Sequence, residues 1–491
     1  MKGIAYQQDT AAKGQTNDDK KEYIDPLSDE DICKRDVPLL EELGVNTIRT
    51  YAINPEEDHE ACMKMLDDAG IYVISDLSQP QLSIKRDAPQ WNVPLYNRYK
   101  AVVDELAQYS NVIGFFAGNE VSDAKNNTEA SAYVKAALRD TKQHIADQGY
   151  NLGVGYASND HPDIREEIAQ YFNCGEDIEA TDYWGYNIYS WCGESTMARS
   201  GYNDQIEFFR DYNVPVFFAE YGCNNPGGAE GRIWQDTEAL YNDEMTEVFS
   251  GGLVYMYFQE ENDYGVVEIK NGKAERMDNF EGLADAHAAA DPKGVDEDEY
   301  TASGDREQCP EINDVWRAHS KLPPTPDEDL CECMVAASSC APVDDLKEKD
   351  FGEIFGFICG SDEDVCIGIN GNATTGVYGA YSMCSDRQKL TYVLGAYYDA
   401  QDGAADACDF DGSAETKDSS ADSSCDEALS SADSINEEAA TATSPTSNTE
   451  NTGSPSSDGG DGGDDEGAAG NLAVGLYMTF AMAVGTLMVA L

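Results

Sequence analysis

Residues 112–119 read VIGFFAGN, an almost uninterrupted apolar run that is followed directly by Glu120. Such a run predicts a strand of a parallel sheet, because those strands are buried on both faces. Runs of similar length recur along the chain. The eight predicted strands comprise residues 3–7, 47–53, 72–78, 112–119, 152–158, 182–190, 215–221 and 252–258.

Amphipathic stretches separate these strands, so the order is strand, helix, strand, helix throughout. The predicted helices include residues 29–43, 56–69, 94–109 and 128–148. Eight such units over about 260 residues fit a closed (β/α)8 barrel better than an open doubly wound sheet. The sequence therefore predicts an α/β fold in which residues 1–320 form a TIM barrel.

The chain is strongly acidic. Its 491 residues include 94 Asp and Glu against 32 Lys and Arg, a formal net charge of −62. Because a phosphate backbone is itself negative, this balance argues against a nucleic-acid partner. A chain of this length also has room for more than one domain.

The fourteen cysteines fall into two blocks, six from Cys33 to Cys309 and eight from Cys331 to Cys425. Both counts are even and neither block has paired CxxC spacing, which favours disulfides in an exported protein over zinc sites. The eight cysteines alone leave about 105 possible pairings. Since Met1 already lies at the start of the first predicted strand, we expect the chain to lack its true start, including a secretion signal.

The region after the barrel divides by composition. Residues 321–330 read as a stiff proline-bearing linker, residues 331–425 as a small disulfide-rich module, and residues 426–471 as a disordered stalk of Ser, Thr, Asp and Gly. The last 20 residues, 472–491, are apolar and uncharged. Small residues followed by a spacer and such a tail predict a GPI-attachment signal, with a transmembrane helix as the alternative. The candidate attachment region contains Asp458, Gly459, Asp461 and Gly462.

Two glutamates stand at the ends of predicted strands, Glu120 after the fourth and Glu220 in the seventh. The carboxyl ends of barrel strands are where TIM barrels carry their chemistry, and strands four and seven face one another across the mouth. A pair of carboxylates is what glycoside hydrolysis requires. Asn119 could bind a sugar hydroxyl, and seven aromatic residues at strand ends could stack on sugar rings. These are Tyr51, Tyr183, Trp184, Tyr189, Trp191, Tyr221 and Tyr257.

The sequence has no motif that indicates a different kind of active site. The five histidines have no HExxH arrangement, and the chain has no nucleophile elbow, phosphate loop or dinucleotide fingerprint. We therefore expect neither a metal nor a cofactor. Sequons at Asn126 and Asn372 predict glycan acceptors in a secreted protein.

Segments such as NTIRTYAI at 46–53, FFAGNEV at 115–121 and PVFFAEYGCN at 215–224 make residues 1 to about 320 resemble the catalytic domain of glycoside hydrolase family 72, the GPI-anchored β-1,3-glucanosyltransferases of fungal cell walls. Residues 331–425 resemble the carbohydrate-binding module of family 43 that follows it in one branch, as in CECM at 331–334 and TTGVYGAYSMCS at 374–385. One departure is Met256, where the family generally has Glu. The matching segments of the first domain are GIAYQ at 3–7, NTIRTYAI at 46–53, YVISDLS at 72–78, FFAGNEV at 115–121, YWGYNIYSWCG at 183–193, PVFFAEYGCN at 215–224 and FSGGLVYMYFQEENDYG at 249–265.

The resemblance implies a role for individual residues. Glu120 would be the acid/base and Glu220 the nucleophile of a retaining mechanism. The implied sugar-binding residues are Gln7, Tyr51, Asp76, Asn119, Tyr189 and Tyr257. The implied disulfides are Cys33 to Cys62, Cys192 to Cys223 and Cys174 to Cys309. In the module, exposed aromatics such as Tyr378, Tyr381, Tyr397 or Tyr398 would bind glucan.

The implied activity is cleavage of a β-1,3-glucan and transfer of its new reducing end to the non-reducing end of another glucan, which elongates wall glucan. The partners would be donor and acceptor β-1,3-glucan chains and, through a GPI anchor, the outer face of the plasma membrane. We expect a monomer. An endo-β-1,3-glucanase and a non-catalytic glucan-binding wall protein remain as alternatives.

Overall fold

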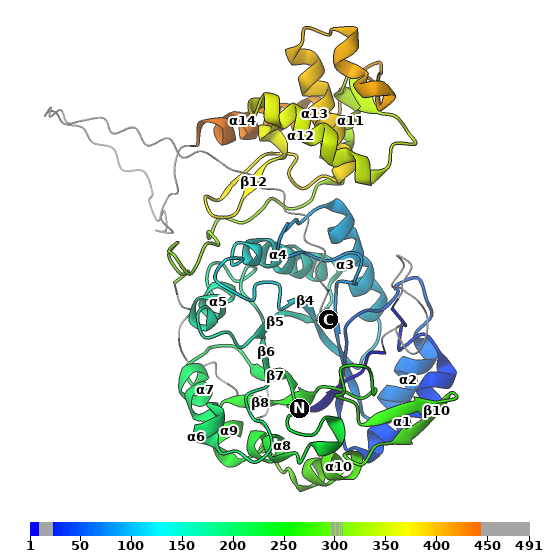
Figure 1. Cartoon of the computed structure of the whole chain (residues 1–491), viewed down its shortest axis with the longest axis vertical. Helices are drawn as coiled ribbons and strands as arrows, with labels where there is room; N and C mark the ends of the chain where they lie inside the picture. The colour runs from blue at the N-terminus through cyan, green and yellow to red at the C-terminus, as the bar shows by residue number, and fades with distance from the viewer. Residues whose placement is uncertain (9–22, 296–299, 301–303, 305, 307, 443–491) are drawn as a thin grey trace, which may run out of the picture. The chain divides into compact units, whose positions relative to one another are not determined.

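The structure is a computed structural model that describes residues 1–8, 23–295, 300, 304, 306 and 308–442 (Figure 1). Its first part is a closed barrel of eight parallel strands in chain order. Pairing of Gly3 with Leu253 joins the last strand to the first. The strands are β1 Lys2–Ala5, β2 Thr47–Thr50, β3 Tyr72–Asp76, β4 Val112–Asn119, β5 Gly153–Asn159, β6 Trp184–Ile188, β7 Val216–Tyr221 and β8 Phe249–Val254.

Helices surround this barrel (Figure 1), so the predicted TIM barrel is confirmed. A short hairpin of β9 Val267–Lys270 and β10 Lys273–Arg276 follows β8. The helices of this part are α1 Glu30–Glu42, α2 Glu60–Asp68, α3 Val93–Leu106, α4 Ala130–Gln148, α5 Arg165–Phe172, α6 Met197–Ser200, α7 Tyr202–Phe209, η1 Ala229–Gly231, α8 Gln235–Leu240, α9 Asp243–Thr246 and α10 Phe280–Ala289.

Local sequence explains where the helices begin and end. Asp29 caps α1 by accepting hydrogen bonds from the backbone N–H groups of Asp31 and Ile32. The helix α4 ends at Gly149, which adopts φ 75°, a conformation that glycine enters without steric cost.

A small apolar cluster, separate from the main core, is contributed by five strands of the closed barrel. Its buried members are Ile74, Phe116, Ala157, Phe217, Ala219 and Leu253. Position 185 on β6, next to this cluster, has to be glycine, because a Cβ there would clash with the Phe116 ring at 2.7 Å. The apolar strand composition thus fills the barrel and leaves polar chemistry to the strand ends.

The eighth strand differs from the expected residues 252–258, because it runs from Phe249 to Val254. Beyond Val254 the chain also pairs with a later segment, since Met256 N–H donates to Tyr264 O and Phe258 bridges to Val267, while Tyr255 N–H and Tyr257 N–H still donate to Tyr221 O and Ala5 O of the neighbouring strands. Because β8 ends early, Tyr255 lies near the strand ends and Tyr257 does not.

The disulfide-rich module follows. Its four disulfides are Cys331–Cys384, Cys333–Cys425, Cys340–Cys408 and Cys359–Cys366, which selects one of the pairings that the sequence left open. Ser385 and Gln388 form a capping box at the start of α13. The elements are α11 Glu328–Ala337, β11 Cys340–Pro342, η3 Glu348–Asp350, α12 Phe351–Ser361, η4 Asp364–Ile369, β12 Gly371–Asn372, β13 Val377–Tyr378, α13 Asp386–Ala400, η5 Ala405–Cys408, η6 Phe410–Gly412 and β14 Ala414–Thr416.

The expectation of a disordered stalk from residue 426 is wrong for its first third, because Asp426–Thr441 form the helix α14. Ala432 is 1 % exposed and lies in a core cluster with Cys331 and Met334 of α11. Asn436 Oδ1 accepts a hydrogen bond of 2.9 Å from Ala380 N–H. Packing on the module, which the Ser- and Asp-rich composition does not reveal, stabilises this helix.

The proline-bearing linker lies on the barrel and not free of it. Arg139 Nη2 on α4 donates to Pro323 O at 3.0 Å, and Thr325 Oγ1 donates to Asp140 Oδ1 at 2.7 Å. Residues 328–330, the end of the expected linker, already belong to α11.

In the barrel part, the disulfides are Cys33–Cys62, Cys174–Cys309 and Cys192–Cys223, the same three pairs that the resemblance implies. No helix among the described residues is both long and apolar enough to cross a lipid bilayer. The expected attachment region around Asp458 and the tail 472–491 lie outside the described residues.

Candidate active site

Glu220 lies in β7 and is 6 % exposed, while Glu120 follows β4 directly and is partly exposed. The two side chains are linked through shared neighbours. Arg49 contacts both Glu220 and Asn119, and Asn187 contacts both Asn119 and Glu120. The fold therefore brings the two predicted carboxylates into one polar network at the carboxyl ends of β4 and β7.

Arg49 on β2 is the centre of this network and is fully buried. Its Nε and Nη2 donate to the two oxygens of Asp76, each at 2.9 Å, and its Nη1 lies 3.3 Å from Glu220 Oε1. The guanidinium also lies 4.4 Å from the ring centre of Tyr51 and 4.6 Å from that of Phe116. Sequence reasoning missed Arg49, although a lone arginine inside an apolar strand is a signal that it needs buried anionic partners.

Two tyrosines complete the surroundings of Glu220. Tyr51 Oη donates to Oε1 at 2.7 Å, and Tyr189 Oη donates to Oε2 at 2.8 Å. Burial raises the pKa of Glu220 to about 7 and the Glu120 charge adds to this rise, whereas Arg49 and both phenols favour the charged form. Every contact to Glu220 is thus a donor, which suits a carboxylate that reacts as an anion.

Glu120 has a different environment. Its Oε1 accepts a hydrogen bond of 2.8 Å from Asn187 Nδ2, and no guanidinium contacts its carboxylate among the described residues. The same Asn187 amide donates to Asn119 Oδ1 at 3.0 Å. Asn187 thus contacts one of the two carboxylate oxygens of Glu120. Two carboxylates with unlike partners match the division into acid and nucleophile.

Two predicted sugar-binding residues bond to other parts of the protein in this structure, Asp76 to a side chain and Gln7 to backbone groups. Asp76 has both oxygens on Arg49, and burial raises its pKa against the effect of that cation. Gln7 Oε1 accepts from the N–H groups of Tyr51 and Ala52 at 3.0 and 3.1 Å. Both residues hold parts of the site in place.

Tyr257 does not reach the carboxylates in this structure. It is fully buried, and its hydroxyl donates to Asp36 Oδ1 on α1 at 3.0 Å. Tyr255 takes its place, with its ring centre 6.4 Å from that of Tyr51 and 6.3 Å from that of Tyr189. Because β8 ends at Val254, the regular alternation of strand side chains does not extend to these residues.

Of the seven aromatics expected to stack on sugar, Trp184, Tyr221 and Tyr257 are fully buried, so the expectation is wrong for these three. Only Tyr51 and Tyr189 contact Glu220. Every second side chain of a barrel strand points toward the helices, and aromatics there form core. Trp184 packs on Tyr156, Trp191 packs on Tyr202 and Tyr221 bonds to Thr237, whereas Tyr183 packs inside the barrel against Phe116 and Phe217.

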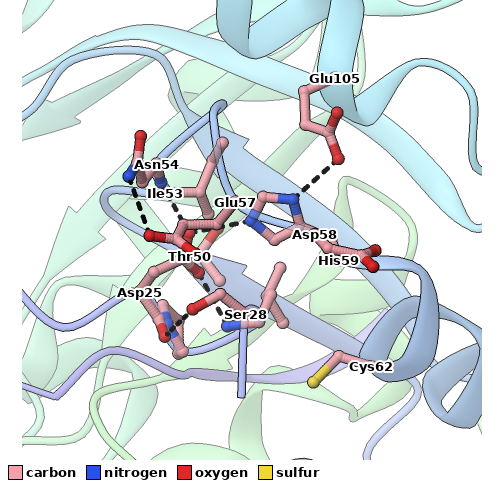
Figure 2. Close-up of polar contacts among 12 residues, drawn as sticks. Asp25, Ser28, Thr50, Ile53, Asn54, Glu57, Asp58, His59, Cys62 and Glu105 are labelled. Carbon is pink, nitrogen blue, oxygen red and sulfur yellow. Dashed lines mark hydrogen bonds and ion pairs between the residues drawn. The ribbon is translucent and has the colours of Figure 1, made fainter. Parts of the chain in front are cut away.

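A buried histidine braces the segment that follows β2 and Tyr51 (Figure 2). His59 Nε2 lies 2.9 Å from Asp25 Oδ2 and its Nδ1 lies 2.8 Å from Glu105 Oε1. Asn54 N–H donates to the same Asp25 oxygen at 2.6 Å. Burial alone would lower the pKa of His59, but its hydrogen bonds to Asp25 and Glu105 outweigh burial and raise it. The cluster ties the segment before α1 to α3.

The module carries an aromatic cluster at its surface. Phe357 is 57 % exposed, and its ring centre lies 6.2 Å from that of Tyr397 and 5.9 Å from that of Phe410. Tyr378 and Tyr381 are buried instead, at 7 % and 3 % exposure. Of the four aromatics expected at the surface, Tyr397 and Tyr398 are partly exposed.

Among the described residues, no group of three or more His, Cys, Asp or Glu side chains is arranged to hold a metal ion.

Comparison with known proteins places these features in a family. Residues 1–291 match the glucanosyltransferase family, glycoside hydrolase family 72, and residues 338–415 match the X8 domain. The chain is 53 % identical to a 1,3-beta-glucanosyltransferase of Arthroderma benhamiae over 84 % of this chain and 76 % of that protein. It is 43 % identical to 1,3-beta-glucanosyltransferase gas1 of Schizosaccharomyces pombe over 90 % of this chain and 80 % of that protein.

A solved structure shares both parts. It is a mutant of Saccharomyces cerevisiae Gas2p in complex with laminaritetraose and laminaripentaose, 40 % identical, with a TM-score of 0.78 over 88 % of this chain and 94 % of that one. The family match covers more than half of the chain and the relatives agree with it along most of their length. The chain therefore belongs to glycoside hydrolase family 72, the glucanosyltransferases, and carries an X8 domain after its catalytic barrel.

Proposed function

We propose that this protein is a retaining 1,3-β-glucanosyltransferase with Glu220 as nucleophile and Glu120 as acid/base. It cleaves a β-1,3-glucan and transfers the new reducing end to the non-reducing end of another glucan. The observation that carries this assignment is the unequal surroundings of the two carboxylates. Three donors stabilise Glu220 as an anion, whereas Glu120 has one amide donor on one oxygen.

In the first step, Glu220 attacks the anomeric carbon of the donor, and the bond from that carbon to the bridging oxygen breaks. Glu120 gives its proton to this oxygen, so the departing chain leaves as an alcohol. A covalent glycosyl-enzyme and an ionised Glu120 result. Arg49 and Tyr51 donate to Oε1 of Glu220 and Tyr189 donates to Oε2, so the oxygen that is not bonded to sugar keeps a donor.

In the second step, Glu120 takes the proton from the 3-hydroxyl of an acceptor glucan. The hydroxyl oxygen attacks the anomeric carbon, and Glu220 leaves as a carboxylate. Water in place of the acceptor would give hydrolysis. Tyr255 and Tyr264, whose ring centres lie 5.3 Å apart, continue the aromatic group from Tyr189 and offer faces on which an acceptor sugar can stack.

Incubation with reduced laminari-oligosaccharides tests the proposal. Products longer than the substrate are expected; products that are only shorter would establish the endo-glucanase alternative. Glu220→Gln and Glu120→Gln should each lower turnover more than about 1,000-fold while glucan binding persists. If the wild-type protein is as inactive as both variants but binds glucan, the non-catalytic wall protein is the correct assignment.

We also propose that the X8 module binds β-1,3-glucan through Phe357, Tyr397 and Phe410. Their rings form a contiguous group with Phe357 as the most exposed member. Aromatic faces of this kind stack on the apolar face of a pyranose. A module that holds the long glucan near the barrel raises the local concentration of donor and acceptor.

We propose further that the protein is secreted, acts as a monomer at the cell wall and the outer face of the plasma membrane, and is held there by a GPI anchor attached near Asp458–Gly462. Asn126 and Asn372 have exposed side chains, as glycan acceptors require. Release of the protein from intact cells by a phosphatidylinositol-specific phospholipase tests the anchor. A mature protein that keeps residues 472–491 would contradict it.

A further inference from the structure

The backbone of Glu120 adopts an uncommon conformation. Its φ is 49°, in the left-handed region that residues with a Cβ seldom occupy. Gly118, two residues earlier, does not have a positive φ, although glycine adopts one more easily. A residue in this region returns to an ordinary conformation unless surrounding contacts hold it. The contacts of the Glu120 peptide groups therefore decide where its carboxylate points.

Three partners hold the peptide groups at and just after Glu120 through four hydrogen bonds. Glu120 N–H donates to Ala157 O on β5 at 2.8 Å. The hydroxyl of Tyr156 accepts from Val121 N–H at 2.9 Å and from Ser122 N–H at 3.4 Å. The carbonyl oxygen of Glu120 accepts a hydrogen bond of 2.7 Å from Arg86 Nη2. The first two come from the barrel itself, whereas Arg86 comes from the segment between β3 and α3.

Arg86 is itself held in place by an acid. Its Nη1 forms an ion pair with Asp123 Oδ2, and the other oxygen of Asp123 accepts from Asn127 Nδ2 at 2.6 Å. Asn127 Oδ1 in turn accepts from the N–H groups of Asp123 and Ala124. The loop after β4 is thus held by its own hydrogen bonds. Arg86 links this loop to the segment between β3 and α3 by bonding to Asp123 and to the carbonyl oxygen of Glu120.

We propose that Arg86 is a positioning residue for acid/base catalysis, which acts by fixing the strained peptide that carries Glu120. This proposal rests on the acid/base role proposed for Glu120. Arg86 contacts the backbone and not the carboxylate, so it is not a catalytic residue. Its loss lets the peptide after Glu120 rotate, and misplacement of a reacting group by about 1 Å costs about 100-fold in rate.

The dependence on the leaving group separates this role from a general loss of structure. A glucan donor needs a proton from Glu120, because its leaving group is a sugar alcohol. A laminaribioside of 2,4-dinitrophenol needs none, because the phenolate leaves unaided. The two donors share the Glu220 attack, and release of dinitrophenolate in the first turnover reports that step alone.

Arg86→Met should lower kcat on reduced laminari-oligosaccharides roughly 10- to 100-fold with little change in KM. First-turnover release of dinitrophenolate should stay within about twofold of wild type, and Arg86→Lys should recover part of the loss by keeping one donor. Arg276→Met is the matched control, because Arg276 is also a half-exposed arginine in ion pairs, with Glu42 and Glu281, and is remote in sequence from the site. It should behave as wild type with both donors.

An equal loss with both donors would overturn the proposal in favour of a purely structural role. Full activity of Arg86→Met on the glucan donor would also overturn the proposal, provided that Glu120→Gln is inactive on the same donor. If Glu120→Gln keeps its activity on the glucan donor, the acid/base assignment itself fails and this proposal fails with it. Thermal unfolding shows whether Arg86→Met folds; if it does not, the same comparison of donors is made with Arg86→Lys.

Discussion

Tyr189 donates a hydrogen bond of 2.8 Å to Oε2 of Glu220, the oxygen that Arg49 and Tyr51 do not contact. Burial of Tyr189 and the charge of Glu220 raise the pKa of this phenol well above 10, so it stays a donor. The two oxygens of Glu220 therefore have separate donors.

Tyr189→Phe should raise the pKa of Glu220, because it removes a donor to the charged form. The acid limb of kcat/KM should move to higher pH, and kcat/KM should fall about tenfold or more. Tyr212→Phe is the control, because Tyr212 donates to Ala169 O, away from both carboxylates. A pH profile unchanged in Tyr189→Phe would show that this hydrogen bond does not tune Glu220.

Arg49→Met should destabilise the fold by about 3 to 5 kcal/mol, because it leaves the Asp76 and Glu220 carboxylates buried without their cation. Urea unfolding at neutral pH measures this loss. The matched substitution Arg276→Met breaks exposed ion pairs and should cost less than about 1 kcal/mol. Equal losses in the two variants would contradict the view of Arg49 as the centre of a buried network.

His59→Gln should change how stability depends on pH. Because the folded-state pKa of His59 is raised above 6.5, its contribution is fully present below pH 6.5 and is lost as pH rises through the raised value. The advantage of wild type over His59→Gln in unfolding free energy should therefore shrink from pH 6 to pH 9.

The quantity to measure is the difference in unfolding free energy between wild type and His59→Gln, because His287 changes the stability of both proteins with pH in the opposite direction. Burial lowers the pKa of His287 to about 4, so that residue costs stability at acid pH in both proteins. A wild-type advantage that stays constant with pH would mean that His59 is not charged between Asp25 and Glu105.

Removal of the Cys174–Cys309 disulfide should cost more stability than removal of Cys359–Cys366. The paired cysteines are 135 residues apart in the first case and 7 in the second, and loop-closure entropy grows with this separation. The chain-entropy estimate gives about 5 and about 2 kcal/mol. Double Cys→Ser variants compared by denaturant unfolding test the order, and a reversed order would contradict this account.

Phe357→Ala should weaken binding of the protein to insoluble β-1,3-glucan roughly tenfold, since an aromatic contact contributes roughly 1 kcal/mol or more. Transfer between short laminari-oligosaccharides should be unchanged, because these reach the barrel without the module. Tyr72→Ala removes another exposed aromatic, 47 % exposed at the start of β3, and should leave glucan binding intact. A loss of binding only in Tyr72→Ala would place the glucan surface elsewhere.

The barrel could be predicted from the sequence because its signal is local. Each parallel strand is buried on both faces, so VIGFFAGN and its counterparts are apolar along their length, and the helices between them are amphipathic. The places of Glu120 and Glu220 follow from the same pattern, because a glutamate at the end of a buried strand lies at the barrel mouth. These features need no knowledge of distant partners.

The partners of those carboxylates were decided only by the tertiary structure. Arg49 meets Asp76, Asn119 and Glu220 across 27 to 171 residues of chain, and nothing near Arg49 in sequence indicates which acids it will contact. The choice of Tyr255 over Tyr257 depends on where β8 ends, and the helix α14 depends on the module surface against which Ala432 packs. The local pattern of apolar residues determines which elements form, whereas burial against remote segments determines which polar and aromatic side chains meet.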